Sequence, residues 1–308
     1  MKIFSSLETG FSRALKSLKG VLIAWLAMFF LVVAFIYPLR GSLSSAFGSS
    51  MITDKLTNGL DVEVFADLGP ALGSILSFVT SGFILIYFIG FVINAFITAG
   101  LFGSVRKGNA KFSAQEFFRA GSKNFWSFLI ITLIITLTAN FFSGILIGVP
   151  MMIITSLETI SEKTQFSIVI AAIVILLLIL PVFFLVADYS RAWKATHENE
   201  SGFRAIGFGF SQTFSKFWSS YFMMLLLIAS QIILGIIILI FLPSWKPATG
   251  GGVFLLLIIS QLFLILRLLI KTWRYASVTS MMEETAKTIP ENLNTFQDEQ
   301  GRSNQTEG

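Results

Sequence analysis

The chain has 308 residues, of which 55% are hydrophobic and only 13% are charged, and its mean hydropathy is +0.80. A water-soluble domain is about 45–50% apolar and about 25% charged, so this composition excludes an ordinary soluble fold and indicates that lipid solvates part of the chain. The sequence holds no cysteine and one histidine, which excludes disulfides, thiolate metal sites and a multi-histidine centre, and its net charge of +5 fits a membrane surface better than nucleic acid.

Six apolar stretches reach or approach the length of about 20 residues that a helix needs to cross a bilayer. They lack the alternation of polar and apolar residues that marks a membrane-barrel strand. The sequence therefore predicts an all-α integral membrane bundle of six transmembrane helices over residues 1–285, followed by a polar, disordered cytoplasmic tail over 289–308. In chain order the predicted spans are residues 21–37, 75–102, 125–149, 166–187, 217–242 and 253–273.

The basic residues alternate between the two sides of the membrane. Eighteen of the 22 fall at the N-terminus, in the connections after the second and fourth spans, and from the end of the sixth span into the tail. The other three connections hold only Arg40, Lys55, Lys163 and Lys246. Because Lys and Arg are enriched in cytoplasmic loops, this pattern predicts that both termini are cytoplasmic, and it supports the count of six spans.

An amphipathic stretch with aromatic and basic residues precedes each odd-numbered span. The three stretches contain Phe11-Ser12-Arg13-Ala14, Phe117-Phe118-Arg119-Ala120 and Phe210-Ser211-Gln212-Thr213. In the first two, Ser5 and Ser113 begin capping boxes, which favour the start of a helix there. Such helices lie flat at the headgroup boundary, so we expect three parallel repeats of an interfacial helix and a helical hairpin. The alternative is that the three stretches are not repeats, because any cytoplasmic loop that enters a membrane is rich in aromatic and basic residues.

These motifs also carry a resemblance to a known family. The segment Gly100-Leu101-Phe102-Gly103-Ser104-Val105-Arg106-Lys107-Gly108, followed by Phe117–Ala120 and Phe125-Trp126, resembles a prokaryotic family of six-span membrane proteins. It is similar to the membrane domain found with some glycerophosphodiester phosphodiesterases and to stand-alone membrane proteins of unknown function. The resemblance covers about residues 1–285 and implies a fold in the prokaryotic cytoplasmic membrane. It implies no catalytic residue, because the hydrolase of the fused relatives is a separate soluble domain.

A few polar residues fall inside the predicted spans. Apart from Lys271 near the end of the sixth span, Arg267 is the one charged residue there. Three roles are open to it: its guanidinium snorkels toward the cytoplasm, pairs with Asp188 at the edge of the fourth span, or binds a ligand. Pairing with Asp188 requires the fourth and sixth spans to be neighbours. We expect the amides within spans to face inward, as structural hydrogen-bonding groups or, alternatively, along a polar solute pathway; these are Asn94, Asn140, Gln231 and Gln261.

The sequence indicates no catalytic constellation, and we expect no cofactor and no metal. The favoured function is non-enzymatic: a scaffold, lipid-interacting protein or partner subunit that binds anionic lipid headgroups, with a membrane protein or a second copy as further partner. The alternatives are a transporter or channel for a small solute or lipid, and an enzyme acting on lipid headgroups through Asp188, Arg191, His197 and Arg274. The residues expected to contact the inner leaflet are Arg13, Lys16, Lys19, Lys111, Arg119, Lys123, Trp126, Arg204, Lys216 and Trp218.

Overall fold

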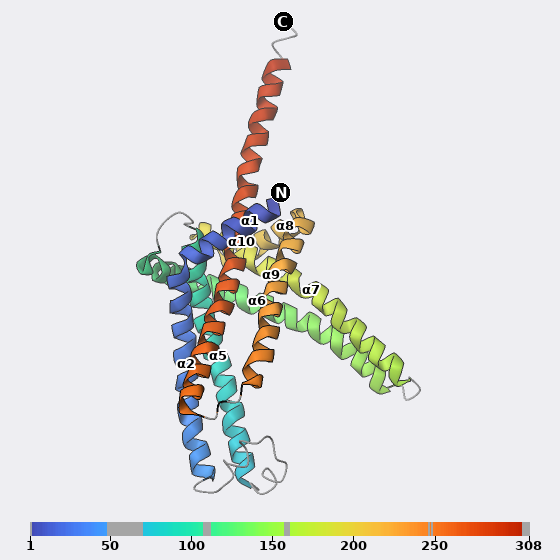
Figure 1. Ribbon diagram of the computed structural model, residues 1–308. Coiled ribbons are helices and arrows are strands. Elements are labelled where there is room, and N and C mark those ends of the chain that lie inside the picture. Colours follow the sequence, from blue (N-terminus) through green and yellow to red (C-terminus); the bar gives the residue numbers. More distant parts are fainter. Residues whose placement is uncertain are drawn as a thin grey trace. The chain divides into compact units, whose positions relative to one another are not determined.

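The computed structural model describes residues 2–47, 70–106, 112–156, 161–245, 247 and 249–303. This part of the chain contains no strand and folds into α-helices throughout (Figure 1). In chain order the helices are α1 (Lys2–Lys16), α2 (Leu18–Phe47), α5 (Pro70–Arg106), α6 (Ala114–Ser156), α7 (Glu162–Thr196), α8 (Gly202–Ser215), α9 (Phe217–Ser244) and α10 (Gly250–Ser303).

Six of these helices are long and apolar enough to cross a membrane, which confirms the predicted all-α architecture. The candidate spans are Leu18–Pro38, Leu76–Arg106, Ala114–Ser156, Glu162–Thr196, Phe217–Leu242 and Gly250–Thr285. At most 17% of the most apolar window of any span is buried within the protein. Apolar surface of this extent requires lipid around it, so the chain is a multi-pass membrane protein.

The last helix continues further than expected. α10 runs to Ser303, past residue 289 where the sequence predicts a disordered tail, and the described side chains end at Thr285. The expected cytoplasmic tail therefore stays a prediction.

The described chain divides into two compact units, residues 23–94 and residues 1–22 with 95–308. In the smaller unit α2 and α5 pack through aromatic rings and glycines. The rings of Phe35 and Phe83 lie 5.4 Å apart. A side chain at Gly82 would overlap Phe35, and one at Gly90 would press on Leu31, so small residues permit this close pairing.

The core of the larger unit lies where the basic residues are concentrated. Phe102 near the end of α5 stacks on Tyr275 of α10, with ring centroids 4.6 Å apart, and packs edge-on against Phe128 of α6 at 5.8 Å. Tyr189 of α7 and Met223 of α9 are also buried here. The rest of each span leaves large apolar side chains exposed, so this end of the helices is held by protein contacts.

The three amphipathic stretches fold differently from one another. The first and third form the separate helices α1 and α8, whereas residues 114–125 continue without a break into the span of α6. The prediction of a second separate interfacial helix is therefore wrong. Ser113 caps the start of α6 as expected, because its hydroxyl accepts a hydrogen bond from the Glu116 N–H at 3.4 Å. Ser5 instead lies inside α1, where its hydroxyl donates to Glu284 at 3.4 Å.

All three amphipathic stretches pack against the last turns of an even-numbered span. Gly10 of α1 lies directly against Ser277 of α10, and Gly209 of α8 lies directly against Ser190 of α7. Gly103, near the end of α5, meets Ala120 of α6 in the same way. At each contact a larger side chain would collide with the neighbour, so glycine permits the close approach.

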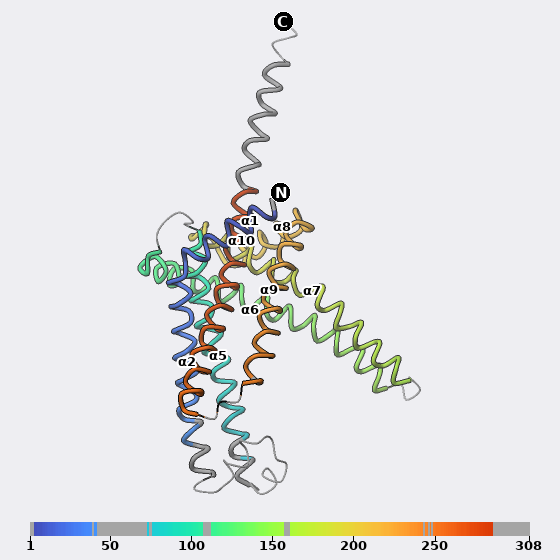
Figure 2. Tube along the Cα trace, viewed as in Figure 1, coloured from blue at the N-terminus to red at the C-terminus, as the bar shows by residue number. Residues whose placement is uncertain are grey.

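α6 and α7 form an antiparallel hairpin, seen side by side in Figure 2. Pro181 lies inside α7 and lacks an N–H, which leaves the Leu177 carbonyl without its usual helical donor. Next to it, the Leu178 carbonyl accepts a hydrogen bond from the Tyr221 hydroxyl of α9 at 2.8 Å. The hydrogen bond ties the hairpin to α9 beside the proline.

Candidate functional site

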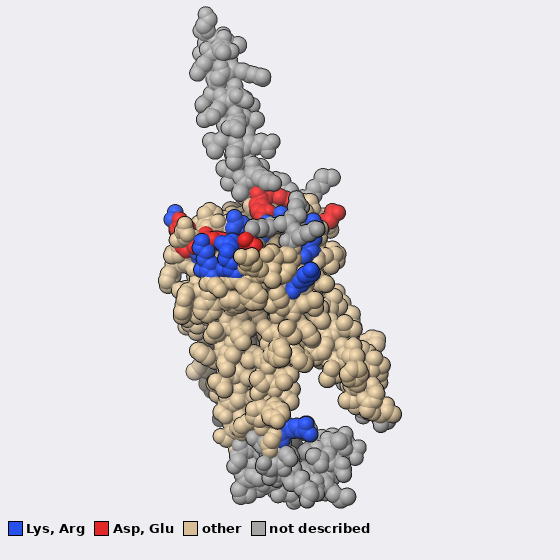
Figure 3. Space-filling view, turned by 90° about the vertical axis from the view of Figure 1, so that its left-hand side faces the viewer, with Lys and Arg blue, Asp and Glu red and all other residues tan. Residues whose placement is uncertain are grey.

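The charged side chains of the larger unit gather mainly in one band, which we call the charged layer (Figure 3). The band lies over the ends of α5 and α7, the middle of α10 around Arg274, the start of α6, and α1 and α8. Its principal members are Arg106, Arg119, Lys123, Asp188, Arg191, Lys194, Glu198 and Arg274.

At the centre of this layer is one buried carboxylate held between two guanidinium groups. Asp188 is fully buried, and its Oδ1 lies 3.2 Å from Nη1 of Arg191, one turn along α7. Its Oδ2 forms an ion pair at 2.8 Å with Nε of Arg274 on α10. Arg191 also donates a hydrogen bond from Nη2 to the Thr132 hydroxyl of α6 at 3.0 Å. The triad therefore links three helices and carries one more positive than negative charge.

Aromatic rings complete the surroundings of Arg274. Its guanidinium carbon lies 5.2 Å from the ring centroid of Phe184 and 5.3 Å from that of Tyr275. Planar guanidinium groups are attracted to ring faces at this range, and the attraction grows as water is excluded. The rings therefore help to offset the cost of burying the second cation of the triad.

The pairing of Asp188 with Arg267, one of the three roles open to that arginine, does not form, although the fourth and sixth spans do meet. The partner on α10 is Arg274, two helical turns from Arg267, because the carboxylate lies level with the end of the span and not with its middle. Arg191 and Lys194 were expected in a loop. They are buried residues of α7, which continues as helix to Thr196.

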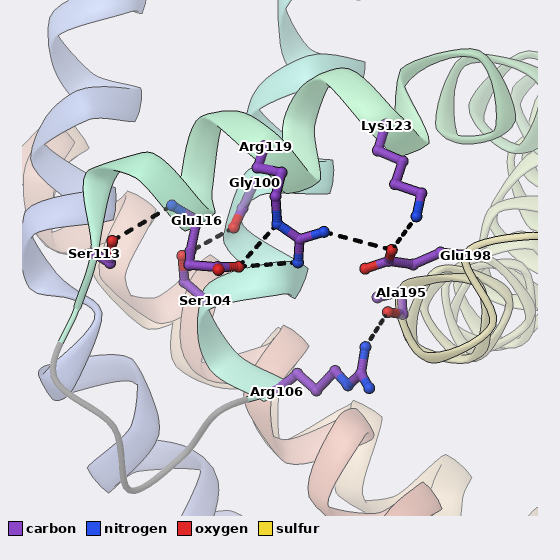
Figure 4. Close-up of polar contacts among 9 residues, drawn as sticks. All are labelled: Gly100, Ser104, Arg106, Ser113, Glu116, Arg119, Lys123, Ala195 and Glu198. Carbon is purple, nitrogen blue, oxygen red and sulfur yellow. Dashed lines mark hydrogen bonds and ion pairs between the residues drawn. The ribbon is translucent and has the colours of Figure 1, made fainter.

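A second acidic group, Glu198, holds the start of α6 to the end of α7 (Figure 4). Its carboxylate lies 2.6 Å from Nζ of Lys123 and 3.6 Å from the guanidinium of Arg119. Arg119 also pairs with Glu116 at 3.0 Å. Lys123, chiefly through its hydrogen bond, holds the pKa of the Glu198 carboxyl below its usual value, so Glu198 stays ionised well into acid solution.

Backbone carbonyls at the end of α7 receive the nearby cations. Arg106, the last residue of α5, donates to the Ala195 carbonyl at 2.6 Å (Figure 4). Lys194 is almost fully buried and donates to the Glu198 carbonyl at 2.6 Å. The Arg106 bond satisfies a carbonyl that the end of a helix leaves without a partner, and both cations are favourable at this negative end of the helix dipole.

On the other side of the larger unit, α1 is fastened to α10. Arg13 pairs with Glu283 at 2.7 Å, and Ser6 donates to Glu284 at 3.3 Å. The indole N–H of Trp273 donates to the Leu7 carbonyl at 2.8 Å, and its ring lies edge-on to Phe11 at 5.3 Å. The amphipathic α1 is thus a packed part of the helix bundle.

Large aromatic side chains project outward around the charged layer. Trp218 is 80% exposed and Trp126 is 71% exposed, so neither ring contributes to the core. Exposed Phe side chains from α1, α6 and α8 accompany them: Phe4, Phe11, Phe118, Phe203, Phe210 and Phe214. Apolar rings exposed beside charged residues are typical of side chains at the level of lipid headgroups.

Of the cations expected at the inner leaflet, most meet partners within the chain. Arg13, Arg119 and Lys123 pair as described, and Arg204 lies 2.9 Å from Glu200. Lys216 donates to the Thr285 hydroxyl at 3.2 Å. Lys16 and Lys19 are exposed, and Lys111 lies outside the described residues. At least five of the eight cations predicted there therefore have a partner within the chain.

The amides within spans differ in exposure and belong to different helices. Asn140 is exposed on α6, Gln261 is half-buried on α10, and Asn94 belongs to the smaller unit. Gln231 lies in a groove between α9 and α10 that Arg267 also lines. A charge at mid-span costs about 2.5–3.5 kcal/mol on insertion scales, which makes this groove the second candidate site.

The residues considered for headgroup chemistry come together only in part. Asp188, Arg191 and Arg274 form the triad, whereas His197 caps the end of α7 and stacks on Trp193 with ring centroids 4.3 Å apart. No group of three His, Cys, Asp or Glu side chains within the described ranges is arranged to hold a metal. Asp188 is held between two cations, an arrangement that joins α7 to α10.

Comparison of the chain with protein-family models, with curated proteins and with solved structures finds no match. The family resemblance noted in the sequence therefore stays a prediction.

Proposed function

We propose that this chain is a non-enzymatic protein of the prokaryotic cell membrane, with both termini in the cytoplasm, that holds anionic lipid against its charged layer at the inner leaflet. The observation that carries the proposal is the set of exposed aromatic rings around that layer. Trp126 and Trp218 project outward at the starts of two spans, beside the basic groups. Their position fits the level of the lipid headgroups, where amphipathic rings are more stable than in water or in the hydrocarbon core.

Two exposed lysines supply the charge for this contact. Lys16 is the last residue of the amphipathic α1, and Lys19 lies in the first turn of α2. A lysine close to an anionic surface contributes about 1 kcal/mol of attraction. Arg119, Lys123 and Arg204 lie beside carboxylates, which compensate part of their charge.

A structural role for the charged layer supports the non-enzymatic part of the proposal. Its acidic groups, Asp188 and Glu198, each meet two cations from the chain itself. A general acid or base needs a proton-transfer partner on a substrate and a pKa near the working pH. Glu198, with its lowered pKa, is suited to holding helices together.

We further propose that the bundle consists of three parallel repeats. Gly10 directly precedes Phe11 and Gly209 directly precedes Phe210, so the two glycines hold equivalent places in the first and third amphipathic stretches. Each lies against a serine on the end of an even-numbered span, Ser277 and Ser190. This shared contact supports a common origin for the first and third repeats, and the close contact of Gly103 with Ala120 is its counterpart in the second.

The proposal is tested with the full chain in lipid nanodiscs that contain phosphatidylglycerol or phosphatidylcholine. Tryptophan fluorescence is quenched by lipids that carry the quencher at the headgroup or at the chain end. We expect the difference between wild type and Trp218→Phe to be quenched most by the headgroup probe. Trp193→Phe is the matched control, because Trp193 stacks on His197 within the layer. Quenching of Trp218 by aqueous iodide, with no response to either lipid probe, would refute the interfacial position.

Lipid preference is measured in the same preparation. Lys16→Gln with Lys19→Gln should reduce the enrichment of phosphatidylglycerol around the protein, while Arg204→Gln, which removes a compensated charge, should change it little. Equal enrichment in wild type and the double variant would contradict the proposed headgroup contact.

A further inference from the structure

The groove between α9 and α10 differs from the rest of the span surface in its polar lining. It measures about 380 Å³ and is bounded by apolar side chains of α9, among them Ile228, Ile232 and Ile238. Gln231 and Arg267 face the same space from the two helices. A volume of this size falls within the range of about 300–1,000 Å³ that is common for small-molecule sites.

Neither polar side chain is satisfied by the protein. Within the described ranges, Arg267 makes no ion pair or hydrogen bond, and neither does the amide of Gln231. Arg267 lies near the middle of the candidate span Gly250–Thr285, about 10 Å along the helix from Arg274. In surroundings without water, donors of this kind need an acceptor. Arg274, by contrast, forms an ion pair with Asp188.

We infer that this groove binds a phospholipid, with its phosphate paired to Arg267 and hydrogen-bonded by Gln231. The planar guanidinium presents parallel N–H donors that match two phosphate oxygens. The isoleucine wall takes an acyl chain. A phosphodiester keeps its negative charge in apolar surroundings, whereas burial raises the pKa of a fatty-acid carboxyl and neutralises it. Phosphate is therefore the better complement to a mid-span arginine.

This site goes beyond the proposed headgroup contact, because it lies in a different part of the span and uses none of the same residues. Its occupant is drawn below the headgroup level by the depth of Arg267. A lipid held there should stay with the protein when lipids on the outer surface are washed away by detergent.

The experiment is native mass spectrometry of the full chain, released from nanodiscs that contain phosphatidylglycerol, phosphatidylcholine or oleate. We expect wild type to retain one phosphatidylglycerol. Phosphatidylcholine should be retained more weakly, because its choline cation finds no acid in the groove, and oleate should not be retained. Arg267→Gln should lower retention about tenfold or more, the effect of losing a charged hydrogen bond.

A second variant fills the groove and keeps the charge. A side chain at Gly235, which lines the groove, enters open space, so Gly235→Leu should fold and block the lipid. The matched controls are Gly144→Leu, also open but on α6, and Arg204→Gln in α8. Both should retain the lipid. Retention by Arg267→Gln or Gly235→Leu at the wild-type level would overturn the inference, as would retention of oleate in place of phosphatidylglycerol. Because Lys16 and Lys19 are untouched, either failure leaves the headgroup contact standing.

Discussion

Nε of Arg274 in α10 lies 2.8 Å from Oδ2 of Asp188 in α7, and this ion pair joins the sixth span to the fourth at the charged end of the bundle. Arg191 binds the other oxygen of the same carboxylate. A single acidic residue thus compensates two buried cations from different helices. Loss of that residue should affect the whole layer.

Replacement of Asp188 by leucine should be among the most destabilising single changes in the chain. It leaves Arg191 and Arg274 buried without a counter-charge, and removal of one member of a buried pair costs about 3–5 kcal/mol. The thermal unfolding midpoint in a fixed detergent measures the effect.

Glu200→Gln is the control for that experiment. Glu200 meets Arg204 at the exposed surface, where a pair contributes about 0–1 kcal/mol. If Asp188→Leu and Glu200→Gln lower the midpoint equally, the buried triad does not hold the helices as described.

Acid should weaken the contact between α6 and α7. The pKa of Glu198 is lowered in the folded protein by Lys123, so its contribution is present above the unfolded pKa of about 4.3 and is lost as pH falls through the folded value. Lys123 is 45% exposed, which limits the contribution to about 1 kcal/mol or less. We expect wild type to exceed Glu198→Gln in unfolding midpoint at pH 7 and to lose that advantage as the pH falls below the unfolded pKa of about 4.3. Parallel curves of unfolding midpoint against pH for the two proteins would show that the Glu198–Lys123 ion pair does not stabilise the fold.

Two glycines of α8 should respond to alanine with opposite signs. The added methyl group at Gly209 would overlap Ser190 and the Val186 carbonyl of α7, and overpacking of this kind costs about 1–3 kcal/mol. At Gly207 the methyl group meets nothing within 4 Å, and alanine favours the helix by about 0.5–1 kcal/mol. Unfolding midpoints of the two variants in one detergent decide the matter. A gain in stability from Gly209→Ala would mean that α8 does not lie against α7 through this residue.

The spans and the level of the charged layer follow from composition, but the partners within the layer do not. Hydropathy locates six helices because lipid imposes a length of about 20 apolar residues on each. Arg267 and Arg274 lie on nearly the same face of one helix, so periodicity does not distinguish them as partners of Asp188. Their depth in the membrane distinguishes them. That depth depends on how α7 and α10 are offset along their axes, which no local sequence pattern predicts.

Local sequence patterns also do not predict which amphipathic segment is continuous with the span that follows it. The amphipathic segment after Ser113 is continuous with the span of α6, whereas a helix break at Lys216 separates α8 from α9. Both segments are aromatic and polar, and neither contains proline at the junction. Glu198 was passed over as a loop residue, although Lys123 and Arg119, one turn apart on a helix, were a signal for a shared acidic partner.

The absence of cysteine makes the topology directly measurable, because a single introduced thiol is the only one in the chain. Lys163→Cys places it at the start of α7, at the far end of the α6–α7 hairpin, and Arg204→Cys places it in α8 beside the charged layer. Intact cells are treated with a maleimide that does not cross the membrane, and then the same cells are permeabilised. The account predicts that the thiol at position 163 reacts in intact cells and that the thiol at position 204 reacts only after permeabilisation. Reaction of both thiols from the same side would contradict a membrane-spanning hairpin between them and, with it, the placement of the charged layer at the inner leaflet.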